Sequence, residues 1–333
     1  MMNAVVMISV GGPDVLQWRE VAKPQLSSPH DMVVRLRAVG VNPVDTKMRA
    51  RGTYYPDRLP CVLGCDGAGV VEAVGDQVER FRPGDEVYFC HGGIGGHPGT
   101  YAEYALVDER FAARKPKSLD FVHAAAAPLV FITAWEALLD RAHVAKGHKV
   151  LIHGGAGGVG HIAIQLAKIQ GARVATTVST HDKSEFTTRL GAEHTIAYKR
   201  NNFVAETLAW TDQEGVDMAL DTVGGDTFNN TISAVKMYGD LVTLLEPPAN
   251  TDWKTARMRN LRIGLELMLT PMYRGMIDAQ RKQADILGRC GDLCDAGLLQ
   301  VHVHATYPLA HAAQAHRALM QDTITGKIVL TVD

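Results

Sequence analysis

The residues with the clearest chemistry form a glycine-rich loop near the middle of the chain. A strand-like apolar segment, 149–153, comes directly before it, and a helical segment beginning at residue 161 follows. The loop reads Gly154-Gly155-Ala156-Gly157-Gly158-Val159-Gly160. Without Cβ atoms, such a loop turns tightly and lets its backbone approach a pyrophosphate, whose charge the start of the helix stabilises. The order strand, loop and helix therefore predicts dinucleotide binding rather than a flexible connector.

The end of the next strand, 173–178, indicates which dinucleotide. An NAD site has an acidic residue there that accepts hydrogen bonds from the ribose hydroxyls. This chain has the neutral Ser179, with Lys183 close enough to reach a 2′-phosphate and Tyr198 after the following strand. We therefore predict NADPH. The alternative is that Asp182 supplies the acid and Lys183 is an ordinary solvated residue.

Composition excludes several classes of protein. Of the 333 residues, 46% are hydrophobic and 21% are charged, and the formal net charge is −2. This balance argues against disorder and provides no basic surface for nucleic acid or an anionic membrane. None of the five cysteines forms a CxxC pair, so neither a disulfide framework nor a zinc ribbon is predicted. We expect a soluble, cytoplasmic protein that binds neither nucleic acid nor a membrane.

The elements that must position these residues follow from periodicity and turns. The length favours two domains. Up to about residue 116 the chain has short strands separated by turns, which predicts an all-β region. From 149 to 245 strands and helices alternate, which predicts an α/β domain with a doubly wound parallel sheet. From about 271 a long polar helix ends near 297, and a strand, a helix and a strand follow.

Short motifs along the whole chain carry a family resemblance. They are Val41-Asn42-Pro43-Val44-Asp45, Leu63-Gly64-Cys65-Asp66-Gly67, Arg82-Pro83-Gly84-Asp85, Gly99-Thr100-Tyr101-Ala102-Glu103, Thr133-Ala134-Trp135, the glycine loop, Asp221-Thr222-Val223-Gly224-Gly225 and Gly326-Lys327-Ile328-Val329-Leu330. In these the chain resembles the zinc-independent quinone oxidoreductases of the medium-chain dehydrogenase/reductase superfamily, which include zeta-crystallin. The resemblance implies a GroES-like catalytic domain, 1–127 and 271–333, interrupted by a Rossmann NADP-binding domain, 128–270.

The same resemblance predicts that the site holds no metal. Where zinc-dependent relatives have a cysteine ligand, this chain has Asn42, and Val44 replaces a hydroxyl residue of their proton relay. Cys65 stands where their histidine ligand stands. A catalytic zinc needs three protein ligands, so we expect none to bind here. The alternative that Cys90 and two nearby histidines hold a metal is weaker, because glycine-rich loops with histidines are common.

The resemblance also assigns roles to individual residues. It implies that Asn42 and Thr133 border the nicotinamide, and that the bound cofactor is lined by Thr222, Val223 and Leu244. It places Tyr54 and Tyr55 over the substrate, where a tyrosine can donate a hydrogen bond to a carbonyl that gains negative charge. Which tyrosine does so stays open, as does the alternative that both rings only pack under a surface loop. Asp45 and Asp66 are expected to organise backbone turns.

The leading prediction is an NADPH-dependent oxidoreductase that transfers hydride to a quinone or another conjugated carbonyl without zinc. The alternative is a reductase of enones or 2-enoyl thioesters, for which Arg257, Arg259 and Arg262 could bind the phosphates of coenzyme A. An alternative of another class is an RNA-binding or structural crystallin-like protein. The resemblance also implies a homodimer that pairs through the edge strand of the Rossmann sheet, predicted here at 263–269, which is apolar and lacks protective lysines and prolines.

Overall fold

The computed structural model describes residues 1–321 and 323–333 of the chain. Its packing divides the chain into two compact units, one made of residues 1–132 and 269–333 and the other of residues 133–268. The second unit is therefore continuous in sequence and interrupts the first. The sequence analysis places the two boundaries at 127/128 and 270/271.

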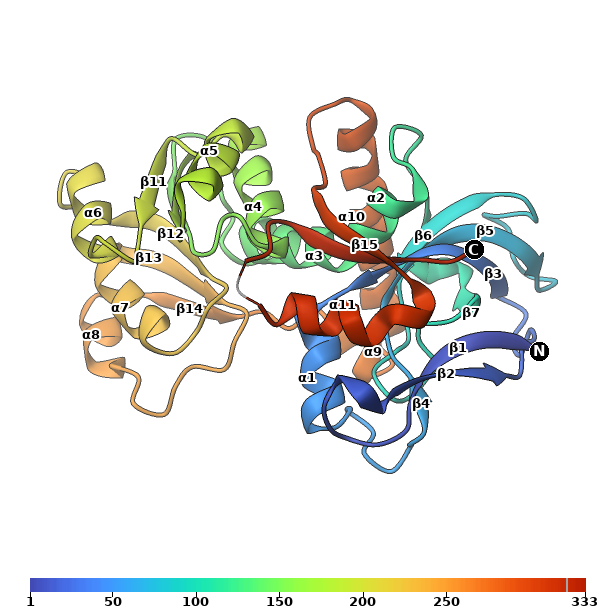
Figure 1. Cartoon of the computed structure of the whole chain (residues 1–333). Helices are drawn as coiled ribbons and strands as arrows, with labels where there is room; N and C mark the ends of the chain where they lie inside the picture. Colours follow the sequence, from blue (N-terminus) through green and yellow to red (C-terminus); the bar gives the residue numbers. More distant parts are fainter. Residues whose placement is uncertain (322) are drawn as a thin grey trace. The chain divides into compact units, whose positions relative to one another are not determined.

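The first unit is built mainly from antiparallel strands (Figure 1). Its strands are β1 (Met2–Met7), β2 (Leu16–Val21), β3 (Asp31–Val41), β4 (Cys61–Val62), β5 (Asp66–Val74), β6 (Glu86–Cys90), β7 (Tyr104–Asp108), β8 (Ala112–Arg114), β15 (Val303–Pro308) and β16 (Lys327–Thr331). One sheet has the order β2-β1-β4 and the other β15-β16-β3-β5-β6-β8, with β7 also paired to β3. Because β16 pairs antiparallel with β3, the last strand of the chain packs beside one of the first.

Helices complete the first unit. They are α1 (Pro43–Arg51), α2 (Phe121–Ala126), α9 (Thr270–Tyr273), α10 (Ile277–Asp295) and α11 (Ala312–Leu319), with short 3-10 turns at Pro13–Val15, Glu109–Phe111 and Leu309–His311. Helix α3 (Pro128–Trp135) and a π-helical turn (Glu136–Arg141) follow α2.

The prediction that the N-terminal region is all-β is wrong at α1. The helix begins directly after β3, with Pro43 in its first turn. The Asp45 carboxylate accepts a hydrogen bond from the Asn42 backbone N–H at 2.8 Å, so it caps the start of the helix. Proline in the first turn and an acid three residues after the cap are both helix-start signals. The short strand patterns on either side hid them.

The second unit is a doubly wound parallel sheet, which confirms the predicted α/β fold class. Its strands are β9 (Lys149–Ile152), β10 (Arg173–Val178), β11 (His194–Ala197), β12 (Val216–Asp221), β13 (Val235–Thr243) and β14 (Arg262–Leu265). Its helices are α4 (Gly158–Ile169), α5 (His181–Leu190), α6 (Phe203–Trp210), α7 (Asp226–Ala234) and α8 (Trp253–Met258). The sheet order is β11-β10-β9-β12-β13-β14, and every pair is parallel.

This strand order reverses between β9 and β12. Chains that leave neighbouring strands in opposite directions open a crevice at the carboxyl ends of the strands, where ligands of such sheets bind. Helices pack on both faces of the sheet, α4 with α5 and α6 with α7 (Figure 1). Buried apolar residues fill the space beneath them, among them Leu151, Ala219 and Phe228.

Three predicted elements have different bounds in the structure. Strand β13 begins at Val235 rather than near 241, with a register shift against β12, and Tyr238 has a left-handed φ of 61°. Strand β14 ends at Leu265 rather than at 269. The long polar helix predicted from about 271 is two helices, because Gly275 adopts a φ of 63° between α9 and α10. Among the described residues, no helix is long and apolar enough to cross a membrane.

Candidate functional site

The glycine loop connects β9 to α4 at the point where the strand order reverses. Gly157 is the N-cap of α4, and its backbone is extended. A Cβ on Gly160 would lie 2.3 Å from the Gly154 carbonyl oxygen, and one on Gly155 would lie 2.0 Å from the Thr176 hydroxyl. Side chains therefore do not fit at these positions, and the loop lies close to both its helix and the neighbouring strand. This cradle at a helix start fits the pyrophosphate of a dinucleotide.

The buried His153 supports the glycine loop through hydrogen bonds with neighbouring threonines. His153 Nε2 lies 2.9 Å from the Thr231 hydroxyl, and Nδ1 lies 3.3 Å from the Thr177 hydroxyl. Since Thr231 donates its own proton to the Thr227 carbonyl, it accepts from Nε2–H. Burial lowers the pKa of His153 to about 4, so the ring is neutral. The neutral ring positions Thr177, whose hydroxyl accepts a hydrogen bond from the Gly154 N–H at 3.0 Å.

The residues chosen to distinguish NADPH from NADH gather beside this loop. Ser179 follows the last residue of β10, and Lys183 lies in the first turn of α5, where its N–H donates to the Thr180 hydroxyl at 3.3 Å. Tyr198 follows β11 and is brought beside β10, because its backbone N–H donates to the Val178 carbonyl at 3.3 Å. The end of β10 therefore carries the neutral Ser179, and the first turn of α5 beside it carries both Asp182 and Lys183.

The remaining predicted cofactor residues of the second unit lie at the same edge of the sheet. The Thr222 hydroxyl donates to the His153 carbonyl at 2.8 Å, which ties the end of β12 to the glycine loop. Val223 is 55% exposed beside it. The Leu244 N–H donates to the Asp221 carbonyl at 3.0 Å, which places Leu244 at the end of β13. Thr133 is buried near the start of the unit.

In the first unit, Asn42 lies in a buried polar centre that the sequence analysis did not foresee. Its amide nitrogen donates to the Asp66 carboxylate at 2.9 Å, and its amide oxygen accepts from the Lys327 amine. The amine also donates to the Val41 carbonyl at 3.2 Å and lies 3.7 Å from the Asp66 carboxylate. Burial lowers the pKa of Lys327 on balance, and the nearby Asp66 carboxylate opposes this shift. Three acceptors around one amine suit an ammonium group with three N–H donors.

A second chain of hydrogen bonds starts at the cap of α1. The Tyr101 hydroxyl lies 3.1 Å from the Asp45 carboxylate and 3.0 Å from His316 Nε2, and all three side chains are buried. Burial raises the pKa of Asp45 to about 7 and lowers that of His316 to about 3. The Asp66 carboxylate accepts a hydrogen bond from the Leu129 N–H at 2.8 Å. Asp45 therefore holds the turn that begins α1, as predicted, whereas Asp66 bonds to the start of α3 and pairs with Lys327.

The two thiols nearest this centre are held in the protonated form. A hydrogen bond with Cys90 lowers the pKa of Cys65. Burial and the nearby carboxylates together raise that pKa by more, so the net shift is upward. The rings of His91 and His97 lie 5.8 Å apart, and burial lowers the pKa of His91 to about 4. In the described part of the chain, no three His, Cys, Asp or Glu side chains are grouped to hold a metal.

The structure distinguishes the two tyrosines whose roles the sequence left open. The Tyr55 hydroxyl donates to the Tyr273 carbonyl at 3.2 Å. The Tyr54 hydroxyl has no hydrogen-bond partner among residues 1–321 and 323–333. Its pKa is raised by burial and, to a smaller extent, by the neighbouring Cys65, so the phenol keeps its proton. Tyr273, which the sequence analysis missed, packs against both rings.

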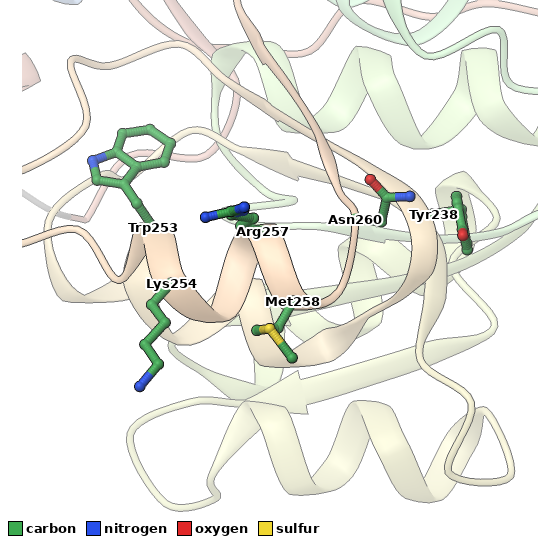
Figure 2. A pocket seen from close by; sticks show the side chains of 6 residues that line it. All are labelled: Tyr238, Trp253, Lys254, Arg257, Met258 and Asn260. Carbon is green, nitrogen blue, oxygen red and sulfur yellow. The ribbon is translucent and has the colours of Figure 1, made fainter.

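A pocket on the second unit lies away from the glycine loop. It is lined by Tyr238, Trp253, Lys254, Arg257, Met258 and Asn260 (Figure 2). Its lining residues come from β13, from α8 and from the residues just after α8, and none of them belongs to the glycine loop. Of the three arginines considered for coenzyme A phosphates, Arg259 donates to the Val235 carbonyl and Arg262 pairs with the Asp240 carboxylate. Of the three, only Arg257 lines this pocket, so the alternative of a three-arginine phosphate site gains no support from the pocket.

Comparison with known proteins agrees with this architecture. Residues 28–117 match the family described as alcohol dehydrogenase GroES-like domain, and residues 190–330 match the family described as zinc-binding dehydrogenase. The chain is 32% identical to a quinone oxidoreductase of Pseudomonas aeruginosa, over 99% of both chains. It is 34% identical to a 2-haloacrylate reductase of a Burkholderia species, again over 99% of both. The structure of the Escherichia coli quinone oxidoreductase complexed with NADPH has a TM-score of 0.88 and 27% identity, covering 99% of this chain and 100% of that one.

The GroES-like and Rossmann-type folds, together with relatives that match nearly end to end, define an oxidoreductase of the medium-chain dehydrogenase/reductase superfamily, to which this chain belongs. Within the superfamily it falls among the proteins similar to quinone oxidoreductases.

Proposed function

We propose that this chain catalyses the NADPH-dependent reduction of a quinone or another conjugated carbonyl, without a metal ion. The observation that carries the proposal is the Lys327 centre. An amine, an amide and a carboxylate are bonded to one another where zinc-dependent relatives need metal ligands. An ammonium group there already balances the Asp66 charge and would repel a divalent cation.

NADPH as the cofactor is supported by the neutral end of β10. No carboxylate stands at Ser179 to bind ribose hydroxyls, and Lys183 lies in the first turn of the adjoining helix. A 2′-phosphate would meet a lysine and a helix start, both favourable to an anion. The relatives named quinone oxidoreductase include one whose structure holds NADPH. When bound, the cofactor supplies the hydride.

The chain's own residues would hold the acceptor and supply the proton. We propose Tyr54 as the donor to the acceptor oxygen, because its hydroxyl makes no hydrogen bond within the described residues and keeps its proton. Tyr55 would act by holding Tyr273 in place. Asn42 would be a positioning residue rather than a catalytic one, because both ends of its amide are already bonded within the chain. One hydride from the cofactor and one proton convert a carbonyl to an alcohol, an enone to an enol, or a quinone to a hydroquinone.

A second candidate function is reduction of the carbon–carbon double bond of a conjugated acid. The relative named 2-haloacrylate reductase, 34% identical over nearly the whole chain, favours it. The thioester alternative has less support, since Arg259 and Arg262 are bonded within the chain. No contact in the described residues favours the RNA-binding or crystallin-like alternative. A cytoplasmic location stays a prediction.

A homodimer is a separate proposal. Strand β14 ends the sheet and is paired on one side only, with β13. Leu265 at its end is 57% exposed, and Leu267 just beyond is 49% exposed. An unpaired strand with exposed leucines is suited to pairing with a second copy of itself.

The experiment that tests the function is an NADPH-oxidation screen in the presence of a chelator. It compares quinones, enals, enones, conjugated acids and enoyl-coenzyme A thioesters. We expect quinones or simple conjugated carbonyls to be reduced at full rate after metal removal. Turnover of thioesters alone, or activity that depends on added zinc, would disprove the proposal.

A further inference from the structure

Three tyrosine rings from two distant stretches of the first unit form one aromatic cluster. The Tyr54 and Tyr273 ring centroids are 5.1 Å apart, and those of Tyr55 and Tyr273 are 5.8 Å apart in an edge-to-face arrangement. All three residues are half-buried. Their rings therefore pack on one another and still leave aromatic surface open. A flat conjugated molecule can stack on such a surface.

Two guanidinium groups border the same cluster. Arg58 lies 5.3 Å from the centroid of the Tyr55 ring, and Arg274 lies 4.7 Å from that of the Tyr273 ring. Both arginines are exposed. Within the described chain neither forms an ion pair with a carboxylate, and Asp57, although adjacent to Arg58, makes none with it. The aromatic surface is thus flanked by two positive charges that no nearby anion balances.

This combination has a definite recognition chemistry. A guanidinium group that lies over a ring keeps its N–H edge free for a carboxylate or sulfonate, and its fork binds two oxygens of such a group at once. The rings would meanwhile hold the flat, electron-poor part of the same molecule. The rings alone would not distinguish an anionic acceptor from a neutral one, and the arginines alone would not require a flat one.

We infer that the cluster of Tyr54, Tyr55, Tyr273, Arg58 and Arg274 is an acceptor subsite that selects planar conjugated molecules carrying an anionic substituent. The inference rests on the proposed function, because it requires that acceptors bind beside Tyr54. It goes further by naming a substrate class, in which a carboxylate or sulfonate is attached to a quinone or another conjugated acceptor. The competing explanation is that the arginines only cover a tyrosine-rich loop.

A matched pair of probes separates the two explanations. The anionic probe is 1,4-naphthoquinone-2-sulfonate and the neutral one is 1,4-naphthoquinone, each assayed with NADPH. The test variant is R58Q/R274Q. The control is R281Q, which removes an exposed arginine on α10 in the same unit. Because intrinsic reactivity differs between the probes, each variant is compared with the unmodified chain on one probe at a time.

We expect R58Q/R274Q to lower kcat/KM for the sulfonate about tenfold or more, mainly through KM, and to change that of the neutral quinone less than about twofold. Raising the salt concentration should raise KM for the sulfonate in the unmodified chain only. R281Q should change neither probe. A Tyr273→Leu variant should weaken both probes alike, because stacking does not depend on charge.

Each alternative outcome has a distinct meaning. Equal effects of R58Q/R274Q on the two probes, or no effect on either, would overturn the subsite while leaving the proposed function intact. If the unmodified chain reduced neither quinone with NADPH, the proposed function itself would fail. Thermal unfolding of each variant shows whether a loss comes from misfolding, in which case the single variants R58Q and R274Q replace the double one.

Discussion

Adjacent residues of one type can have different roles, and Tyr54 and Tyr55 are an example. The two rings share a neighbour in Tyr273, but only the Tyr55 hydroxyl is used in a hydrogen bond within the chain. The sequence indicates where the two tyrosines are but not which of their hydroxyls is bonded within the chain. The partner of Tyr55 is a backbone carbonyl more than 200 residues away, which no local pattern reveals.

The first prediction follows from that difference. Tyr54→Phe should lower kcat for quinone reduction on the order of 10²-fold, because a positioned proton donor is lost. Tyr55→Phe removes only the bond to the Tyr273 carbonyl and should leave kcat nearly unchanged. Steady-state kinetics with saturating NADPH measure both. A larger loss in Tyr55→Phe than in Tyr54→Phe would reverse the assignment.

Lys327 gives a second prediction at the same scale. Lys327→Met would leave the Asp66 carboxylate and the Asn42 amide oxygen buried without their cation. Removing one member of a buried ion pair costs about 3–5 kcal/mol of unfolding free energy. The double variant K327M/D66N should recover part of that loss, since no charge then stays unpaired. Urea unfolding of the unmodified chain, the single variants K327M and D66N and the double variant measures the coupling, and purely additive losses would contradict it.

At the scale of elements, the sequence predicts most where periodicity and glycine chemistry agree. Strands β10 and β12 have the predicted bounds. The prediction fails where tertiary contacts decide. Helix α1 was missed although Pro43 and Asp45 mark its start. Strand β13 begins before its apolar part, and this added stretch includes a register shift against β12 and the left-handed Tyr238. The Lys327 centre was missed because a single lysine next to apolar residues does not reveal that Asn42 and Asp66, far away in the sequence, are its partners.

The glycine loop supplies an element-scale prediction. Gly160→Ala would place a Cβ 2.3 Å from the Gly154 carbonyl oxygen and push the helix start away from the loop. NADPH affinity should fall on the order of tenfold or more, since the phosphate-binding N–H groups move. Gly288→Ala is the control, because its Cβ would meet nothing within 4 Å on helix α10. Fluorescence titration with NADPH measures both, and equal affinities would exclude a role for this close packing.

His153, which supports that loop, predicts a pH dependence of stability. Its pKa in the folded chain is lowered to about 4 from an ordinary 6.5. The unfolded chain therefore binds a proton first as the pH falls, and stability is present above pH 6.5 and is lost toward pH 4. This one group should cost about 2 kcal/mol of unfolding free energy between pH 7 and pH 5. Urea unfolding should show a shallower pH dependence in His153→Asn, and an unchanged slope would contradict the assignment.

At the scale of the whole molecule, the chain combines a continuous parallel-sheet unit with a discontinuous β-rich one. The resemblance predicted this arrangement because motifs at both ends of the chain belong to one unit. Composition and charge excluded classes of partner without choosing a substrate. That choice depends on side chains such as Arg58 and Arg274, which lie on loops and helix ends.

Oligomeric state is tested at this scale too. Leu265→Lys should convert a dimer into a monomer in light scattering, because a charge at the end of β14 would be buried between the paired strands. Leu298→Lys is the control, since Leu298 is 56% exposed, like Leu265 at 57%, but lies in the other unit. A monomeric unmodified chain, or a dimer in both variants, would show that β14 is not the interface.

The most direct test of the central claim is a comparison of NADPH with NADH in the reduction of 1,4-naphthoquinone by the metal-stripped chain. We predict that activity survives metal removal and that kcat/KM is at least about tenfold higher with NADPH, because the proposed partner of Lys183 is a 2′-phosphate that NADH lacks. Activity restored only by zinc, or a preference for NADH, would contradict the account.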